Sequence, residues 1–206
     1  NVRLGIGSDA RIGYSFIYPG VGYGGSCFPK DVKALIDTAA ENGYDAKVIR
    51  SVDEVNNTQK LVLAEKIKAY FEPQGGVAGR TLALWGIAFK ANTDDIREAS
   101  AIQVIKELTG LGMKVRAFDP VANTRAREEI GHIENLEIMD SQYDVLDGAD
   151  ALAVVTDWNQ FRDPDFERIK QALNAPLVFD GRNLYLPERM GKAGFAYFSI
   201  GRSPVE

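Results

Sequence analysis

The sequence contains a single cysteine and a single histidine among its 206 residues. One cysteine excludes an intrachain disulfide. Cys27 and His132 also lie far apart in the chain, which argues against a metal site built from them and against a cysteine hydrolase with a neighbouring histidine base. We interpret His132 as a surface or loop residue.

Long apolar runs and an excess of positive charge are also missing. No apolar run approaches the roughly 20 residues that a helix needs to cross a bilayer. The net charge of -5 and the pI near 5.1 do not suit a nucleic-acid surface, which requires clustered lysine and arginine. We therefore expect no nucleic-acid or membrane partner and a reducing, cytoplasmic location. The first residue is Asn1 and no secretory leader follows it, so we expect the chain to begin inside a longer protein.

The remaining composition, 45% hydrophobic and 26% charged, is that of a globular protein with one large or two small domains. A proline and paired glycines at residues 72–76 predict a boundary. Before it, apolar residues recur at helical spacing over residues 30–42 and 45–71, with Gly43 as the break. We therefore predict a mainly helical segment over residues 1–75 and a second domain over residues 76–206.

The second domain has the pattern of an α/β fold. Short β-rich runs are separated by amphipathic stretches, which predicts a parallel sheet with crossover helices; the runs are residues 81–85, 113–118, 151–155 and 177–179. Between the first two runs, apolar residues from Ile96 to Leu111 predict a helix that Gly110 or Gly112 would cap. Ligands of such sheets bind beyond the carboxyl ends of the strands, where residues 89–90 and 180–183 are expected to meet.

The segment that carries the cysteine is the most informative part of the sequence. Four glycines lie within residues 20–25, just before Cys27, and glycines at that density let backbone amides approach a ligand closely. Pro29 suits the first turn of a helix, so Cys27 would precede the positive end of the helix dipole, beside Lys30. Both features favour a reactive thiolate. Asp31, one helical turn on, could orient a water molecule; the alternative is a buried, inert cysteine next to a structural turn.

Residues 22–31, GYGGSCFPKD, resemble the active-site signature of the UDP-glucose/GDP-mannose dehydrogenase family, and its UDP-glucose branch most closely. Residues 9–13, 86–98 and 180–183 match further family segments in the expected order. The resemblance implies a helical dimerisation segment followed by a Rossmann-like parallel-sheet domain that binds the UDP-sugar. No Gly-x-Gly-x-x-Gly fingerprint follows a predicted strand. We therefore expect NAD to bind mainly to a further domain outside this chain.

The resemblance also implies a chemistry, the NAD-dependent oxidation of UDP-glucose to UDP-glucuronate in two hydride transfers. Cys27 would attack the C6 aldehyde to give a thiohemiacetal, whose oxidation gives a thioester that water hydrolyses readily. Asp31 would activate or position that water. The catalytic lysine and asparagine of the family lie upstream of Asn1, so we expect this chain alone to be inactive.

The same resemblance assigns binding residues. The substrate would be lined by the segment before the cysteine and by two cations; these residues are Tyr18, Pro19, Gly20, Val21, Gly22, Tyr23, Gly24, Lys90 and Arg182. Arg11 would reach the substrate of the partner subunit in a homodimer, while Lys30 and Arg97 would contact the cofactor. From the residues alone, Arg11 and Arg97 could equally be solvated helix charges, Lys90 a surface lysine, and Arg182 a partner for Asp180.

Other conspicuous residues receive structural interpretations. Asp119, before a proline, predicts a turn, and the aromatic residues Trp85, Trp158 and Phe161 are expected in the core or the crevice wall. Residues 93–95 are expected to cap the helix that passes through Arg97. Two alternatives to UDP-glucose oxidation remain open: a dehydrogenase for GDP-mannose or a UDP-N-acetylhexosamine, and a non-catalytic module that binds nucleotide sugars.

Overall fold

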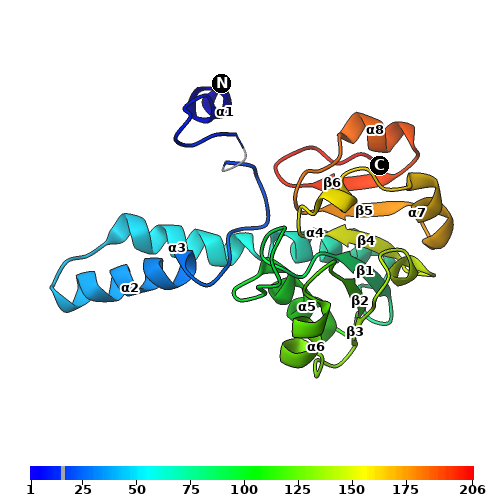
Figure 1. Ribbon diagram of the computed structural model, residues 1–206. Coiled ribbons are helices and arrows are strands. Elements are labelled where there is room, and N and C mark those ends of the chain that lie inside the picture. Colours follow the sequence, from blue (N-terminus) through cyan, green and yellow to red (C-terminus); the bar gives the residue numbers. More distant parts are fainter. Residues whose placement is uncertain (15–16) are drawn as a thin grey trace.

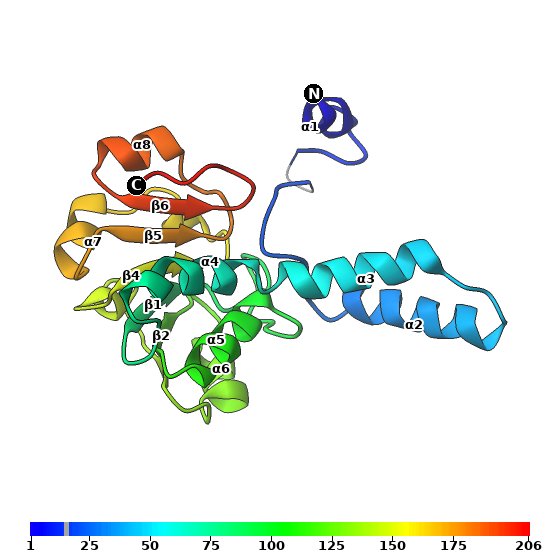
Figure 2. The ribbon, with the colours of Figure 1, turned by 180° about the vertical axis from the view of Figure 1, so that it is seen from behind.

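The computed structural model describes residues 1–14 and 17–206, and begins with a helical part. Its elements are α1 (Val2–Gly7), α2 (Phe28–Glu41), α3 (Lys47–Gln59), α4 (Val62–Phe71) and the 3₁₀ turn η1 (Glu72–Gln74). Helices α2 and α3 pack side by side as a hairpin that projects from the rest of the molecule (Figure 1). Helix α1 lies apart from both, as the view from behind also shows (Figure 2).

The hairpin turns where the sequence predicts, but its second arm is not one continuous helix. Gly43 takes a φ of +70°, a left-handed conformation that favours glycine, directly after the end of α2. The prediction of a single helix over residues 45–71 is wrong, because the helix is interrupted at Lys60 and Leu61. There the Leu61 amide donates to the Thr58 carbonyl, a tighter 3₁₀-type bond, and α4 continues toward the sheet.

The second half of the chain forms a six-stranded sheet in which all neighbouring strands are parallel. The strands are β1 (Thr81–Trp85), β2 (Lys114–Phe118), β3 (Leu136–Ile138), β4 (Ala151–Val154), β5 (Leu177–Asp180) and β6 (Ala196–Ser199). Their spatial order, β3-β2-β1-β4-β5-β6, is the doubly wound Rossmann order. The predicted α/β fold is therefore confirmed, although β3 and β6 were not predicted.

Side chains alternate between the two faces of the sheet and build one core on each. Leu82 and Leu84 of β1 point into a cluster covered by α4, α5 (Ser100–Gly110) and α6 (Asn123–Ile130). Ala83 and Trp85 point into the opposite cluster. That second cluster is covered by η2 (Asp144–Leu146), η3 (Asn159–Phe161), α7 (Phe166–Ala172) and α8 (Pro187–Lys192). This period of two is what a strand buried on both faces requires.

The loop that follows β1 differs from its prediction. The helix expected from Ile96 begins only at Ser100, because Glu98 takes a φ of +54° that is incompatible with a right-handed helix. Residues 93–95 therefore do not cap it, and Ala99 occupies the N-cap position instead. Asp95 binds the backbone and guanidinium of Arg97. At the other end, Gly112 takes the left-handed conformation after the helix, with a φ of +82°.

The residues to which the sequence assigned structural roles lie in the core or in turns, as expected. Trp85, Trp158 and Phe161 are buried in the second cluster. Asp119 is buried after β2, where one carboxylate oxygen accepts from the amides of the following turn and the other from Ile87, Ala88 and Trp158. His132 lies in an exposed turn.

Helix α4 already packs against the sheet, since it contacts both α5 and β5. The predicted boundary at residues 75 and 76 thus follows a helix that shares the core of the sheet, and the division into two domains stays a prediction. No helix within the described ranges combines the length and the apolar character needed for a bilayer crossing.

Candidate active site around Cys27

The segment before Cys27 lies across the carboxyl end of the sheet. The Tyr18 hydroxyl donates to the Asn183 carbonyl at 2.9 Å, and Val21 is buried in the first core cluster. A methyl group on Gly20 would lie 2.7 Å from Nη1 of Arg182. The segment therefore meets residues 181–183, which directly follow β5 at the sheet edge where parallel α/β folds bind ligands.

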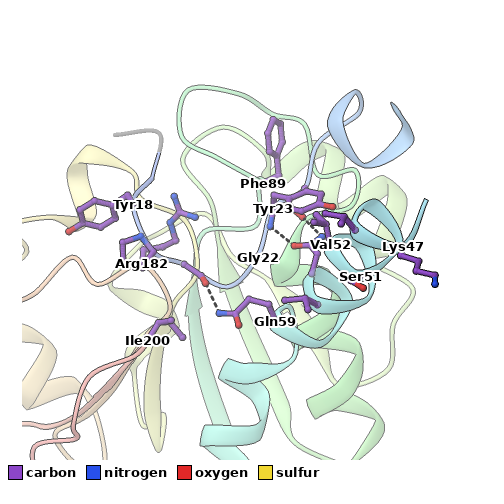
Figure 3. A pocket seen from close by; sticks show the side chains of 16 residues that line it. Tyr18, Gly22, Tyr23, Lys47, Ser51, Val52, Gln59, Phe89, Arg182 and Ile200 are labelled. Atoms are coloured by element: carbon purple, nitrogen blue, oxygen red, sulfur yellow. Dashed lines mark hydrogen bonds between the residues drawn. The ribbon is translucent and has the colours of Figure 1, made fainter. Parts of the chain in front are cut away.

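Helix α3 holds the same segment from the other side. The buried side chain of Asn56 accepts from the Tyr23 amide at 2.8 Å and donates to the Tyr23 carbonyl at 3.1 Å. Gln59 donates to the Gly20 carbonyl at 2.8 Å (Figure 3). Asn56 thus binds both backbone groups of Tyr23, and Gln59 binds the carbonyl of Gly20. Neither side chain was predicted from the sequence.

A signal for these residues was present in the sequence. The buried face of α3 and α4 continues at helical spacing through residues 56, 60, 63, 64, 67 and 71. The first two of these positions are Asn56 and Lys60, which are polar residues on an otherwise apolar face. A polar residue in that position needs a partner. Asn56 pairs with the segment before Cys27, and Lys60 pairs with the loop after β1.

The glycines of the segment are required by close backbone contacts. A methyl group on Gly24 would lie 2.3 Å from the carbonyl oxygen of Glu98, a backbone atom that has little room to yield. Gly22 has a φ of +88°, where any other residue would be strained. Gly20, Gly22 and Gly25 also have the spacing of a dinucleotide fingerprint, but within residues 1–14 and 17–19 no strand precedes them.

Cys27 is exposed and occupies the N-cap position of α2, with Pro29 in the first turn. Its Sγ lies 3.6 Å from Oγ of Ser26, and its carbonyl accepts from the Asp31 amide at 2.8 Å. The Asp31 carboxylate is exposed and lies 3.5 Å from Nζ of Lys30. Cys27 thus lies at the positive end of a 14-residue helix, and its side chain makes no capping hydrogen bond.

Arg182 is the best-positioned cation of the site. Its side chain is 17% exposed, and its Nη2 lies 3.1 Å from Oδ1 of Asp157. Its Nε is buried and has no hydrogen-bond partner in the part of the chain that the structure describes. The alternative that Arg182 pairs with Asp180 is wrong, because Asp180 accepts the backbone amide of Arg182, not its guanidinium.

Asp180 organises the loop that carries Arg182. The carboxylate is fully buried and accepts from the amides of Arg182 and Tyr185 and from the Tyr197 hydroxyl. Burial raises the pKa of this carboxyl, while the hydrogen bonds from Tyr197 and the backbone oppose the shift. Burial also raises the pKa of Tyr197, and the charge of Asp180 adds to that effect.

The other predicted cations do not line the larger cavity. Lys90 is exposed, with Nζ 5.3 Å from the centre of the Phe89 ring. Arg97 forms two hydrogen bonds of 2.9 Å to Asp95, which raise the pKa of Arg97. Arg11 is exposed and pairs with Asp9.

A cavity of about 950 Å³ opens between the segment, α3 and the strand-end loops. Figure 3 shows Tyr18, Arg182 and Phe89 around it, with Gln59 on the α3 side. Six of the seven predicted substrate-binding residues before the cysteine line it, together with Arg182; the six are Tyr18, Pro19, Gly20, Gly22, Tyr23 and Gly24, whereas Val21 is not a lining residue. Lys90 and Arg11 are not among the lining residues.

A second groove, of about 640 Å³, is lined by residues that precede and follow Cys27 in the chain, although Cys27 itself is not a lining residue. Three cations, Lys30, Lys33 and Arg97, line it together with Gly25 and Ser26. Within residues 1–14 and 17–206, no group of three or more histidine, cysteine, aspartate and glutamate side chains could hold a metal ion. The larger cavity thus contains one partly buried arginine, Arg182. The smaller groove is lined by three cations and by the carboxylates of Asp37 and Glu98.

Comparisons with known proteins agree with this arrangement. A model described as the UDP-glucose/GDP-mannose dehydrogenase family, UDP binding domain, matches residues 83–187, and the central-domain model of the same family matches residues 1–58. A UDP-glucose 6-dehydrogenase of Pseudomonas aeruginosa is 51% identical over 206 residues, which cover 98% of this chain and 45% of that protein. The UDP-glucose 6-dehydrogenase TuaD of Bacillus subtilis is 40% identical over 204 residues, 99% of this chain and 43% of that protein.

Among solved structures, a UDP-glucose dehydrogenase from Pyrobaculum islandicum matches with a TM-score of 0.80 at 29% identity, covering 98% of this chain and 43% of that one. The chain therefore spans less than half the length of the curated relatives it matches.

Proposed function

The chain belongs to the UDP-glucose/GDP-mannose dehydrogenase family, and we propose that the protein containing it oxidises UDP-glucose to UDP-glucuronate with NAD. The observation that carries the proposal is the position of Cys27. An exposed thiol stands at the start of a helix, at the end of a glycine-rich segment that borders a cavity with a partly buried arginine. These are the parts that a thiol-dependent oxidation of an anionic sugar substrate requires.

Cys27 is the proposed nucleophile. Its sulfur adds to the C6 aldehyde of the substrate and forms a thiohemiacetal, and the oxidised form of that adduct is a thioester. Water then cleaves the thioester, releasing the carboxylate and restoring the thiol. Cys27 stands at the N-cap of α2, where the helix dipole is positive. A free thiol requires a reducing compartment, so a cytoplasmic location is part of the proposal.

Asp31 is the proposed residue that orients the hydrolytic water. It lies one turn into α2 from Cys27, and its carboxylate is exposed beside Lys30. An exposed carboxylate one helical turn from Cys27 can accept a hydrogen bond from a water molecule that attacks the thioester.

Arg182 is the proposed anchor for the diphosphate of the substrate. It lines the larger cavity, and its buried Nε has a free donor within the described part of the chain. A guanidinium binds phosphate oxygens through paired hydrogen bonds. The segment from Tyr18 to Gly24 would line the rest of the substrate, and Lys90 would approach it from the loop after β1.

The residues of the smaller groove fit one end of NAD. Lys30, Lys33 and Arg97 line this groove together with Asp37 and Glu98, and Glu98 pairs with Lys33. The remaining cations, Lys30 and Arg97, suit the pyrophosphate of a dinucleotide. When bound, NAD accepts the hydrides that the oxidation releases. We assign Lys30 and Arg97 to the cofactor and expect most other cofactor contacts to come from outside this chain.

A homodimer is part of the proposal. The α2–α3 hairpin exposes large apolar side chains, which are Phe28, Leu35, Tyr44, Val48, Val52 and Val55. Helix α1 exposes Val2, Leu4 and Ile6. A second copy covering these faces would place Arg11 near the substrate site of its partner.

The substrate assignment is tested by calorimetric titration of the intact protein with UDP-glucose, UDP-N-acetylglucosamine and GDP-mannose. We expect UDP-glucose to bind best. Arg182→Ala should weaken that binding at least tenfold, because each lost charge-assisted hydrogen bond contributes about 1.5 kcal/mol or more. Arg162→Ala is the matched control, since Arg162 pairs with the same Asp157 but does not line the cavity. Tighter binding of GDP-mannose would overturn the choice of substrate, and equal effects of the two variants would overturn the role of Arg182.

A further inference from the structure

A buried lysine stands where the helical hairpin joins the sheet. Lys60, between α3 and α4, is 2% exposed, and its Nζ lies 2.9 Å from Oε2 of Glu98. Lys33 of α2 approaches the other oxygen of the same carboxylate at 3.4 Å. Lysine is almost never fully buried unless it is paired. Glu98 thus connects both arms of the hairpin to the loop that follows β1.

The backbone of Glu98 is strained and directly supports the segment before Cys27. Glu98 has a φ of +54°, a conformation that is unfavourable for a residue with a side chain. Its carbonyl oxygen is the atom that a methyl group on Gly24 would meet at 2.3 Å. The Gly25 amide donates to the Arg97 carbonyl at 2.9 Å. Cys27 follows two residues later, so any movement of Glu98 reaches the thiol through Gly24 and Gly25.

The ionic character of the pair needs an explanation of its own. Two apolar side chains of similar volume would stabilise such a junction at least as well, and backbone strain persists where the surrounding structure fixes it, often at functional sites. The hydrogen bond from Lys60 lowers the pKa of the Glu98 carboxyl, so the carboxylate is charged at neutral pH. A charged pair with fixed geometry defines one position for the loop, whereas an apolar contact permits several.

We propose that Glu98 and Lys60 are positioning residues that hold the Cys27 segment in register with the substrate cavity. The inference rests on the proposed function, because it makes the pair a determinant of how the intact protein binds its UDP-sugar. Neither side chain lines the larger cavity, although Glu98 lines the smaller groove. Their effect on the substrate cavity therefore passes through the backbone of the segment, through Gly24 and Gly25 for Glu98 and through Gly22 for Lys60, whose side chain lies next to it.

The test uses a charge-neutral double variant of the intact protein, Lys60→Met with Glu98→Gln. Removing one cation and one anion leaves the net charge unchanged, so long-range electrostatic effects on the thiol largely cancel. The matched control is Lys68→Met with Glu107→Gln, since this pair has the same 2.9 Å separation but joins α4 to α5. Two quantities are measured. The first is the UDP-glucose concentration that halves the rate at which iodoacetamide alkylates Cys27, followed by mass spectrometry of the peptide that contains Cys27. The second is the hydrogen exchange rate of the Gly25 amide without ligand.

We expect the Lys60 and Glu98 double variant to need at least tenfold more UDP-glucose for protection and to exchange the Gly25 amide at least tenfold faster. The control double variant should change neither value, even if its melting temperature falls by a similar amount. Lys60→Arg, which keeps the charge, should retain both wild-type values. Wild-type protection and exchange in the Lys60 and Glu98 double variant would overturn the inference.

Two further outcomes are informative. If UDP-glucose does not protect Cys27 in the wild-type protein, the proposed function fails, and the exchange rate of Gly25 alone decides whether the pair positions the segment. If the double variant does not fold, Glu98→Asn replaces it, because asparagine tolerates the left-handed backbone but carries no charge for Lys60. The same tenfold changes are expected, and their absence overturns the inference.

Discussion

Replacing Asn56 by alanine removes both hydrogen bonds that hold Tyr23 on helix α3. The Tyr23 amide and carbonyl, bonded at 2.8 and 3.1 Å, would each lose their partner. Tyr23 is only partly buried, so water can replace some of the loss, and we take about 1 kcal/mol for each bond. The free energy of unfolding should therefore fall by about 2 kcal/mol, roughly a thirtyfold change in the folding equilibrium.

Asn57→Ala provides the matched control for this measurement. Asn57 is the next residue of the same helix, is exposed, and makes only a 3.3 Å hydrogen bond to Asp53. Any gain in helix propensity, up to about 0.7 kcal/mol, is common to both substitutions and cancels in their difference. Urea unfolding followed by circular dichroism measures both values. A difference below about 0.5 kcal/mol between the two variants would refute the view that α3 holds the segment through Asn56.

Two further predictions concern the contacts of the same segment. Gly24→Ala should lower the free energy of unfolding by about 1–3 kcal/mol, since the new methyl group meets the backbone of Glu98. Gly110→Ala adds its methyl group in open space within α5, so it should raise the free energy of unfolding or leave it unchanged. If both variants behave alike in thermal unfolding, the prediction is contradicted. The hydrogen bond from Lys60 is the main cause that lowers the pKa of Glu98 from its ordinary value of 4.5. The pair therefore stabilises the folded state fully above pH 4.5, and this stabilisation is lost as the pH falls through the lowered pKa. The stability difference between wild type and Glu98→Gln should accordingly shrink in acid, and a difference that stays constant or grows below pH 4.5 would count against the ion pair.

The strands of the sheet interior and the position of the cysteine could be predicted because local signals determine them. The strands β1, β4 and β5 are almost entirely buried, so each appears in the sequence as an unbroken apolar run. Proline at the second position after Cys27 indicates a helix start, and the structure begins α2 at Phe28. Strand β3 gave no such signal, since it has three residues and none is fully buried.

The features that escaped prediction depend on contacts between distant parts of the chain. The period of apolar residues from Ile96 continues smoothly into α5, and only the contact of Glu98 with Lys60 and Lys33 explains the left-handed residue that separates them. In the same way, Asn56 is one polar residue among several on α3 until its partner, Tyr23, is known. Sequence spacing shows which face a residue occupies, but not what that face meets.

The central claim is that Cys27 is the nucleophile of a four-electron oxidation, and counting NADH tests it most directly. The intact protein is supplied with NAD and a limiting amount of UDP-glucose, and the NADH formed is compared with the substrate consumed. We predict two NADH for each UDP-glucose and no steady-state turnover in Cys27→Ala, because the aldehyde then has no thiol to form the thioester. One NADH for each substrate with an aldehyde product, or full turnover in Cys27→Ala, would contradict the account.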